Sequence, residues 1–305
     1  EYYRVYGDSS IRGFEGQSRS PLYAKLEKDR HSAMWGDYLT DNESSNADIA
    51  RIQRTLTGLN GIFDNGKTRV QLFAAEQDNM RGFEEIPGNG TAMQYQLQDA
   101  PIVKSSEVIE IITRDRANIG LIIAQETLQR FRDYSIDDYT GYLTFHRVIP
   151  SLDDELNPVS IRISYDRVEE GEDYLVAGVR LMHQLSDNLN VGASYTRDEH
   201  ETEGYQLAGI HTEFKDEITE LQLGVARMSH NEGNEGGDAL RLKASRKWTP
   251  DSRTELVATQ ADAGYSNNSS GVIADRREIK LSQHQKLNNT TEAKLELSHS
   301  EALSR

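Results

Sequence analysis

From residue 174 onward, amphipathic runs of about ten residues are joined by connections that are alternately short and long. The short connections fall at residues 186–188, 215–217, 249–252 and 287–289, and the long ones at residues 198–204, 231–237 and 264–274. An up-and-down barrel sorts its connections by rim in this way, whereas a soluble sandwich has no reason to do so. We therefore expect an all-β fold, an antiparallel up-and-down transmembrane β-barrel that is complete or partial.

Taking every second residue of these runs separates two faces of each strand. The residues expected to face lipid are Leu189, Val191, Tyr195, Leu221, Leu223, Val225, Leu240, Leu242, Trp248, Leu295 and Leu297. Their neighbours are polar and would face a wet interior, where charges of both signs carry no lipid cost. The run 205–214 alternates poorly, because His211 and Glu213 share a face with Leu207.

Composition narrows the function classes. The chain has 305 residues, of which 36% are hydrophobic, and a formal net charge of -16, which disfavours nucleic acid as a partner. It has no Cys, so disulfides, thiolate catalysis and Cys-ligated metals are excluded. No apolar run is long enough for a transmembrane helix. The first residue is Glu1, which suggests a processed protein or a fragment of a longer one.

The first 83 residues also read as barrel strands. The expected strands are residues 2–6, 22–28, 33–39, 56–63 and 68–76. Asn65-Gly66 predicts a tight hairpin between the last two, because both residue types tolerate positive φ. Residues 41–52 are a loop or one short helix. With the later hairpins this gives about 13 strands outside the central segment, an odd count that suggests an incomplete chain or a miscounted strand. We expect residues 1–80 and residues after 174 to form one continuous sheet.

Residues 84–167 differ from the rest of the chain in proline content and in hydrophobic pattern. They contain four of the six prolines, Pro87, Pro101, Pro150 and Pro158. The apolar runs 108–112 and 119–124 lack alternation, which is typical of strands buried on both faces. We predict a small β-sandwich-like domain inserted between N-terminal barrel strands (1–83) and C-terminal barrel hairpins (168–305). Such a domain would plug the lumen or cap one rim.

The segment 133–145 (DYSIDDYTGYLTF) resembles a recurrent segment of large Gram-negative outer-membrane proteins. These include the barrel of the gliding-motility and type IX secretion translocon and related surface proteins, and residues 34–38, 86–90 and 106–108 look like other parts of the same pattern. The resemblance implies a large barrel with inserted β domains, and it brings no catalytic residue. Independently, the segment reads as a hairpin in which Gly141 permits the turn and Ile136, Leu143 and Phe145 pack inward.

Candidate ligands are few. Asp153, Asp154 and Glu155 cluster oxygen atoms of the type that Ca²⁺ prefers, and Asp137 lies on a neighbouring turn of the expected hairpin. No EF-hand spacing accompanies them, so an exposed acidic turn is the competing interpretation. The His residues form no closely spaced metal-binding pair. No other cofactor is indicated.

These observations favour an outer-membrane protein of a Gram-negative bacterium that acts in transport, anchoring or surface presentation, without catalysis. Its partners would be outer-membrane lipid and other outer-membrane or surface proteins. One alternative is a soluble acidic all-β surface or adhesion protein that binds a partner or cations through its loops. A second is a barrel hydrolase, which would need a Ser, a His and an acidic residue to converge near a rim.

Overall fold

The protein is built from antiparallel β-strands, as a computed structural model shows for residues 22–40, 47–93, 95–168, 172–231, 236–288 and 290–304. No helix occurs among these residues, so none is long and apolar enough to cross a membrane. The expected all-β, antiparallel class is therefore confirmed. The strands fall into one 12-stranded sheet and two smaller sheets of three and four strands.

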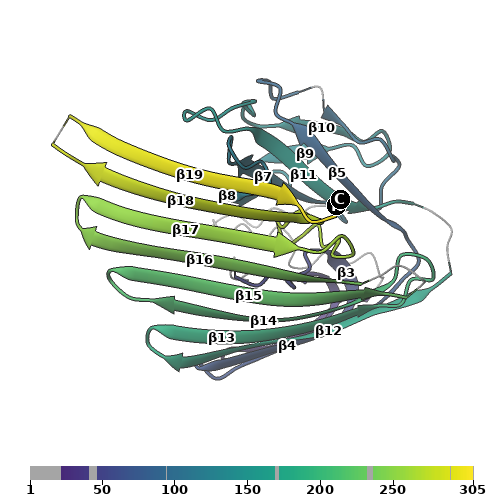
Figure 1. Ribbon diagram of the computed structural model, residues 1–305. Coiled ribbons are helices and arrows are strands. Elements are labelled where there is room, and N and C mark those ends of the chain that lie inside the picture. The colour runs from purple at the N-terminus through teal and green to yellow at the C-terminus, as the bar shows by residue number, and fades with distance from the viewer. Residues whose placement is uncertain are drawn as a thin grey trace, which may run out of the picture.

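The large sheet runs in the order β1-β2-β3-β4-β12-β13-β14-β15-β16-β17-β18-β19 (Figure 1). Its strands are β1 (Ala24–Lys28), β2 (His31–Leu39), β3 (Thr55–Asp64), β4 (Thr68–Gln77), β12 (Tyr174–Ser186), β13 (Leu189–Asp198), β14 (Tyr205–Lys215), β15 (Thr219–His230), β16 (Gly237–Thr249), β17 (Ser252–Ala261), β18 (Arg276–Lys286) and β19 (Glu292–Ala302). The strands expected from the alternation pattern are present, except that residues 2–6 lie outside the described residues.

Strands β4 and β12 join the two halves of the sequence. They pair antiparallel over ten positions, from Tyr174 opposite Gln77 to His183 opposite Thr68. The prediction of one continuous sheet is thus confirmed for the described strands of residues 24–77 and those after residue 174. The sheet does not close on itself among the described residues, because β1 and β19 are its two edges.

The connections are sorted by end. In Figure 1 the short turns of β12–β13, β14–β15, β16–β17 and β18–β19 gather at the left and the long loops at the right. The β3–β4 turn shows how a short connection is stabilised. The Asn65 side-chain oxygen accepts hydrogen bonds from the backbone N–H groups of Lys67 and Thr68 at 3.0 and 2.7 Å. Gly66 adopts a φ of 88°, which other residues rarely adopt.

The segment between β4 and β12, residues 81–166, is called the insert below. Its strands are β5 (Arg81–Pro87), β6 (Tyr95–Gln96), β7 (Val108–Arg114), β8 (Ile122–Thr127), β9 (Tyr134–Ile136), β10 (Tyr142–Phe145) and β11 (Val159–Asp166). They form a four-stranded sheet, β5-β11-β7-β8, and a three-stranded sheet, β6-β10-β9. One apolar core contains residues of both sheets, including Ile161 and Ile163 from β11 and Leu143 and Phe145 from β10.

The insert contains the hairpin predicted at residues 133–145 and the two apolar runs predicted to be buried on both faces. The hairpin prediction is confirmed: β9 pairs with β10, Gly141 has a φ of 71°, and Leu143 and Phe145 are buried. The run 119–124 is not buried on both faces, however. Ile119 is 53% exposed in the turn between β7 and β8, and Ile123 is 48% exposed on β8, which is the edge strand of its sheet. The prediction is confirmed for the run 108–112 on β7, where every residue but the partly buried Ile111 is buried, and burial on both faces also holds for the central strand β11.

The face of the large sheet that carries Leu223, called the outer face, differs from the opposite inner face. Residues 47–54 and the β17–β18 connection (residues 262–275) fold onto the inner face, where Ile49, Leu207, Met228 and Tyr265 belong to one buried cluster. This contact explains the poor alternation of β14, since Leu207 turns inward to join that core. The inner face is therefore apolar near the long-loop end and polar elsewhere.

Candidate functional site: the outer face and the enclosed interior

The residues expected to face lipid share the outer face. The register sets Tyr195 opposite Ala208, Leu223 opposite Leu242, and Leu281 opposite Leu297, so the aliphatic row continues from strand to strand. In the part of the chain that the structure describes, no second sheet covers these side chains, and Leu295, Leu297 and Trp248 are about 60% exposed. Leu189, Val191 and Leu242 are half-buried by their neighbours, while Tyr195, Leu221, Leu223, Val225 and Leu240 are exposed.

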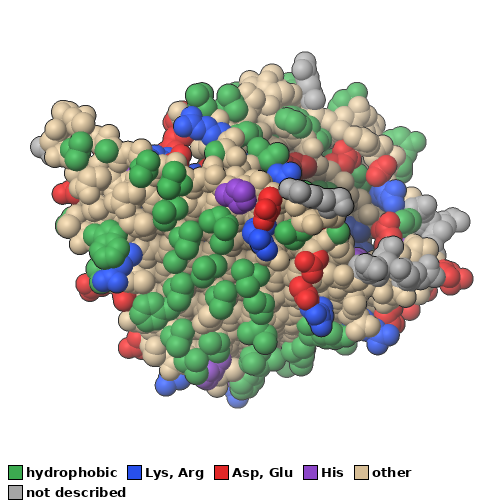
Figure 2. Space-filling model, viewed as in Figure 1, with side chains coloured by type: hydrophobic (Ala, Val, Ile, Leu, Met, Phe, Trp, Pro, Cys, Tyr) green, Lys and Arg blue, Asp and Glu red, His purple; other side chains and the backbone are tan. Residues whose placement is uncertain are grey.

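Figure 2 shows this face as a broad area of hydrophobic side chains over the strands, with charged groups mainly around its margins. The area extends onto β3 and β4, where Leu59 and Leu72 are 55% and 58% exposed. At the short-turn end, the Arg246 guanidinium lies 4.7 Å from the centre of the Trp248 ring. An apolar surface of this extent, unlike scattered single residues, marks a surface that contacts another apolar medium or molecule.

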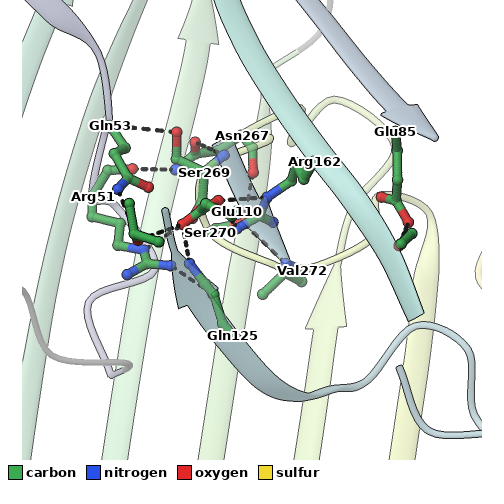
Figure 3. A network of polar contacts seen from close by, with 12 residues as sticks. Arg51, Gln53, Glu85, Glu110, Gln125, Arg162, Asn267, Ser269, Ser270 and Val272 are labelled. Atoms are coloured by element: carbon green, nitrogen blue, oxygen red, sulfur yellow. Dashed lines mark hydrogen bonds and ion pairs between the residues drawn. The ribbon is translucent and has the colours of Figure 1, made fainter. Parts of the chain in front are cut away.

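The interior is held by a polar network that joins three segments far apart in the sequence (Figure 3). Arg51 donates to the Ser269 carbonyl oxygen at 2.9 Å and to the Gln125 side chain at 3.0 Å. In the insert, Arg162 pairs with Glu110 at 2.6 Å. Asn267 donates to the Arg51 carbonyl oxygen at 2.9 Å. The loop at 47–54, the loop at 262–275 and the insert are thereby fixed to one another.

A second buried cluster surrounds Arg54, where the loop at 47–54 enters β3. Its guanidinium bonds Asp166 of the insert at 3.1 Å, Asp198 of β13 at 3.2 Å and the Tyr174 hydroxyl at 2.8 Å. Burial would lower the pKa of Arg54, but Asp166 and its other partners raise it well above its usual value. The arginine therefore stays charged and ties the insert to the large sheet.

The insert also contacts the inner face of β18 and β19 directly. Asp115 pairs with Lys280, the Gly120 backbone N–H donates to Glu278 at 3.1 Å, and Lys294 pairs with Glu155 at 2.8 Å. Burial tends to raise the pKa of Asp115, but the hydrogen bond from Lys280 and backbone N–H donors lower it overall. These contacts fix the insert on the inner side of the sheet.

A cavity of about 260 Å³ lies between the insert and strands β15 to β19. Its lining includes Arg241 and Lys243 of β16, together with Arg116 and Ile122 of the insert. Arg241 and Lys243 point to the same inner face because they are two residues apart on one strand. Sequence reasoning placed both on the inner face, but it gave no signal that a cavity would form there.

The candidate calcium ligands do not converge. Among the residues that the structure describes, no group of three or more His, Asp or Glu side chains could hold a metal ion. Asp153 accepts hydrogen bonds from the backbone N–H groups of Glu155 and Asn157, both at 2.8 Å. Glu155 pairs with Lys294. Hydrogen bonds from Thr140 and the Tyr139 backbone lower the pKa of Asp137, which shapes its own turn. The Asp154 side chain makes no hydrogen bond or ion pair with any described residue.

One Ser, His and Asp do come together on the inner face. Ser194 donates to Asp48 at 3.3 Å, and His211 Nδ1 lies 3.8 Å from the same carboxylate. His211 Nε2 faces the Met182 sulfur at 3.1 Å. A hydrolytic triad needs the serine bonded to the histidine. Here the serine is bonded to the carboxylate, so the arrangement is that of a packed polar core.

No protein-family model, no curated protein and no solved structure matches this chain. The resemblance of residues 133–145 to outer-membrane barrels therefore remains a prediction.

Proposed function

We propose that this chain forms the wall, or a sector of the wall, of an outer-membrane β-barrel whose insert occupies the interior. It would act in transport, anchoring or surface presentation rather than in catalysis. The observation that carries the proposal is the difference between the two faces of one continuous sheet. Along the middle of the strands the outer face exposes aliphatic rows that no described residue covers, while charged residues such as Lys280 lie on the inner face, which receives the insert. The outer-face ion pairs Arg227–Asp238 and Arg277–Glu301 lie toward the long-loop end. A lipid-facing wall requires this arrangement.

Strand length and the sorting of connections support the same proposal. Strands β12 to β19 contain 10 to 13 residues each. A strand tilted by ~45° needs about 9–11 residues to cross the hydrocarbon region. Short turns at one end and long loops at the other match the periplasmic and external rims of such barrels.

An unpaired strand edge cannot lie in hydrocarbon, because its backbone groups would find no hydrogen-bond partner. The proposal therefore requires that β1 and β19 are paired in the membrane, either with each other or with further strands. The insert would obstruct the interior, since its ion pairs to β18 and β19 hold it there. Any passage would then depend on releasing these contacts.

The absence of Cys makes a direct test possible, because any introduced Cys is the only label site. Single Cys at Leu223, Val225 and Leu297 would be labelled with an environment-sensitive fluorophore after reconstitution into phospholipid vesicles. Glu220 and Gln222, on the inner face of the same strand, provide matched controls. We expect brominated lipid to quench the outer labels strongly and the inner labels weakly.

The same preparation separates the proposal from a soluble adhesion protein. A lipid-facing wall needs detergent or lipid to stay dispersed, whereas an acidic soluble protein does not. Equal quenching at Leu223 and Gln222, or a folded monodisperse protein without amphiphile, would overturn the membrane assignment.

A further inference from the structure

The cavity between the insert and β15 to β19 contains unmatched positive charge. The Nε atom of Arg241 is enclosed and has no hydrogen-bond partner in the described part of the chain. No hydrogen bond or ion pair of the Lys243 side chain is found among the described residues either. Both side chains come from the inner face of β16 and line the same cavity.

The other charged side chains of this cavity already have partners, and Arg116 donates to the Glu155 carbonyl oxygen at 3.2 Å. Lys280 pairs with Asp115 and Glu296, and Lys294 with Glu155 and Glu296. The remaining carboxylate of the lining, Glu255, is 3.1 Å from Arg253. The carboxylates around the cavity are therefore engaged with cations other than Arg241 and Lys243.

Arg51 is a further cation of the interior that has no carboxylate partner among the described residues. Its guanidinium bonds neutral acceptors, the Ser269 carbonyl oxygen and the Gln125 side chain, rather than a carboxylate. Removing a guanidinium from water without a counter-ion is unfavourable. In a chain with a net charge of -16, a local excess of partly buried positive charge is a specific feature that calls for an anion.

We propose that this cavity binds a small oxyanion, as inorganic phosphate or as the phosphate group of a small solute. The planar guanidinium of Arg241 can donate two parallel hydrogen bonds to such a group, and Lys243 can add a point charge beside it. The cavity of about 260 Å³ exceeds the volume of several water molecules, so it can admit the anion together with part of a solute. The inference does not depend on the membrane assignment.

Titration calorimetry and thermal unfolding of the full chain in detergent would test this site. The probes are inorganic phosphate, glucose 6-phosphate, and chloride at matched ionic strength. We expect saturable binding of phosphate and a rise in unfolding temperature that chloride does not produce. Tighter binding of glucose 6-phosphate would identify the ligand as a phosphorylated solute, and equal binding would identify it as the free ion.

The variants R241Q and K243Q should each weaken phosphate binding at least ten-fold. K247Q is the matched control, because Lys247 lies on the same strand and inner side but is exposed and outside the cavity lining. Without phosphate, R241Q should unfold at the same or a higher temperature than the unaltered protein, since a buried unmatched charge has been removed. If R241Q misfolds, K243Q still tests the site. Phosphate and chloride having equal effects, or K243Q binding phosphate as tightly as the unaltered protein, would overturn the proposal.

Discussion

At the scale of single residues, the interior is shaped by two glycines that let a loop lie flat on the sheet. A Cβ built on Gly224 would lie 2.0 Å from the Ala47 carbonyl oxygen, and one built on Gly209 would lie 2.3 Å from Ala50 Cβ. Both glycines face the inner side, where the loop at 47–54 crosses β14 and β15. The role of these glycines is close approach rather than an unusual backbone angle.

G224A should therefore lower the free energy of unfolding by about 1–3 kcal/mol, the usual cost of overpacking. G61A is the control, because Gly61 lies on β3 with its nearest neighbouring atom, the Leu72 carbonyl oxygen, 3.9 Å from an added Cβ. It should change stability by less than about 0.5 kcal/mol. Urea unfolding in detergent measures both variants, and equal losses would contradict the close contact.

Acid should loosen the insert from the wall through Asp115. The pKa of this carboxyl is lower in the folded chain than in the unfolded one, where it is about 3.9, because Lys280 and backbone N–H donors outweigh the effect of burial. Its contribution is therefore present above that value and is lost as the pH falls through the folded-state pKa. The protection factors of the backbone amides of residues 115–122, which correct exchange rates for their intrinsic dependence on pH, should be lower at pH 3 than at pH 6.

In D115N these protection factors should already be lowered at pH 6 and should change little on acidification. E126Q provides the control, because Glu126 pairs with Arg147 on the exposed surface of the insert, away from the wall. Protection of residues 115–122 that is independent of pH in the unaltered protein would show that the ion pair does not hold the insert.

At the scale of elements, the strands could be predicted from period-2 alternation, because one face of each is apolar and the turns carry residues suited to tight reversals. The two faces of β14 could not be assigned from alternation, because Leu207 and His211 face inward against a loop that precedes them by more than 150 residues. The same limit applied to β8: an unbroken apolar run does not reveal whether its strand will be central or at an edge.

Arg54 shows how elements depend on one another, since it joins the loop at 47–54, the insert and β13. R54M should lower the free energy of unfolding by about 3–5 kcal/mol, because Asp166 and Asp198 would be left buried without a counter-ion. R54K keeps the charge but cannot bridge both carboxylates, so an intermediate loss is expected. Urea unfolding provides the measurement. A loss below 1 kcal/mol for R54M would show that the two carboxylates find other partners.

At the scale of the whole molecule, the two faces of one sheet have opposite requirements. Alternation in the sequence indicates which residues share a face, and the structure leaves the aliphatic rows uncovered. The interior could not be predicted in the same way. Its ion pairs join residues as distant as Asp115 and Lys280, and whether Arg241 finds a carboxylate is decided only when the insert docks.

The loss in unfolding free energy caused by an arginine on the outer face depends on whether that face contacts lipid or water. Val225 lies near the middle of β15 and is 41% exposed, while Leu221 lies near its short-turn end. In a bilayer, V225R should cost about 2–4 kcal/mol and L221R clearly less, because the penalty falls toward the interface. In water, both exposed substitutions should stay within about 0.5 kcal/mol. Unfolding free energies measured in phospholipid vesicles separate the two cases: a depth-dependent loss requires lipid against this face, whereas two small and equal effects would mean that the aliphatic rows meet water or another protein.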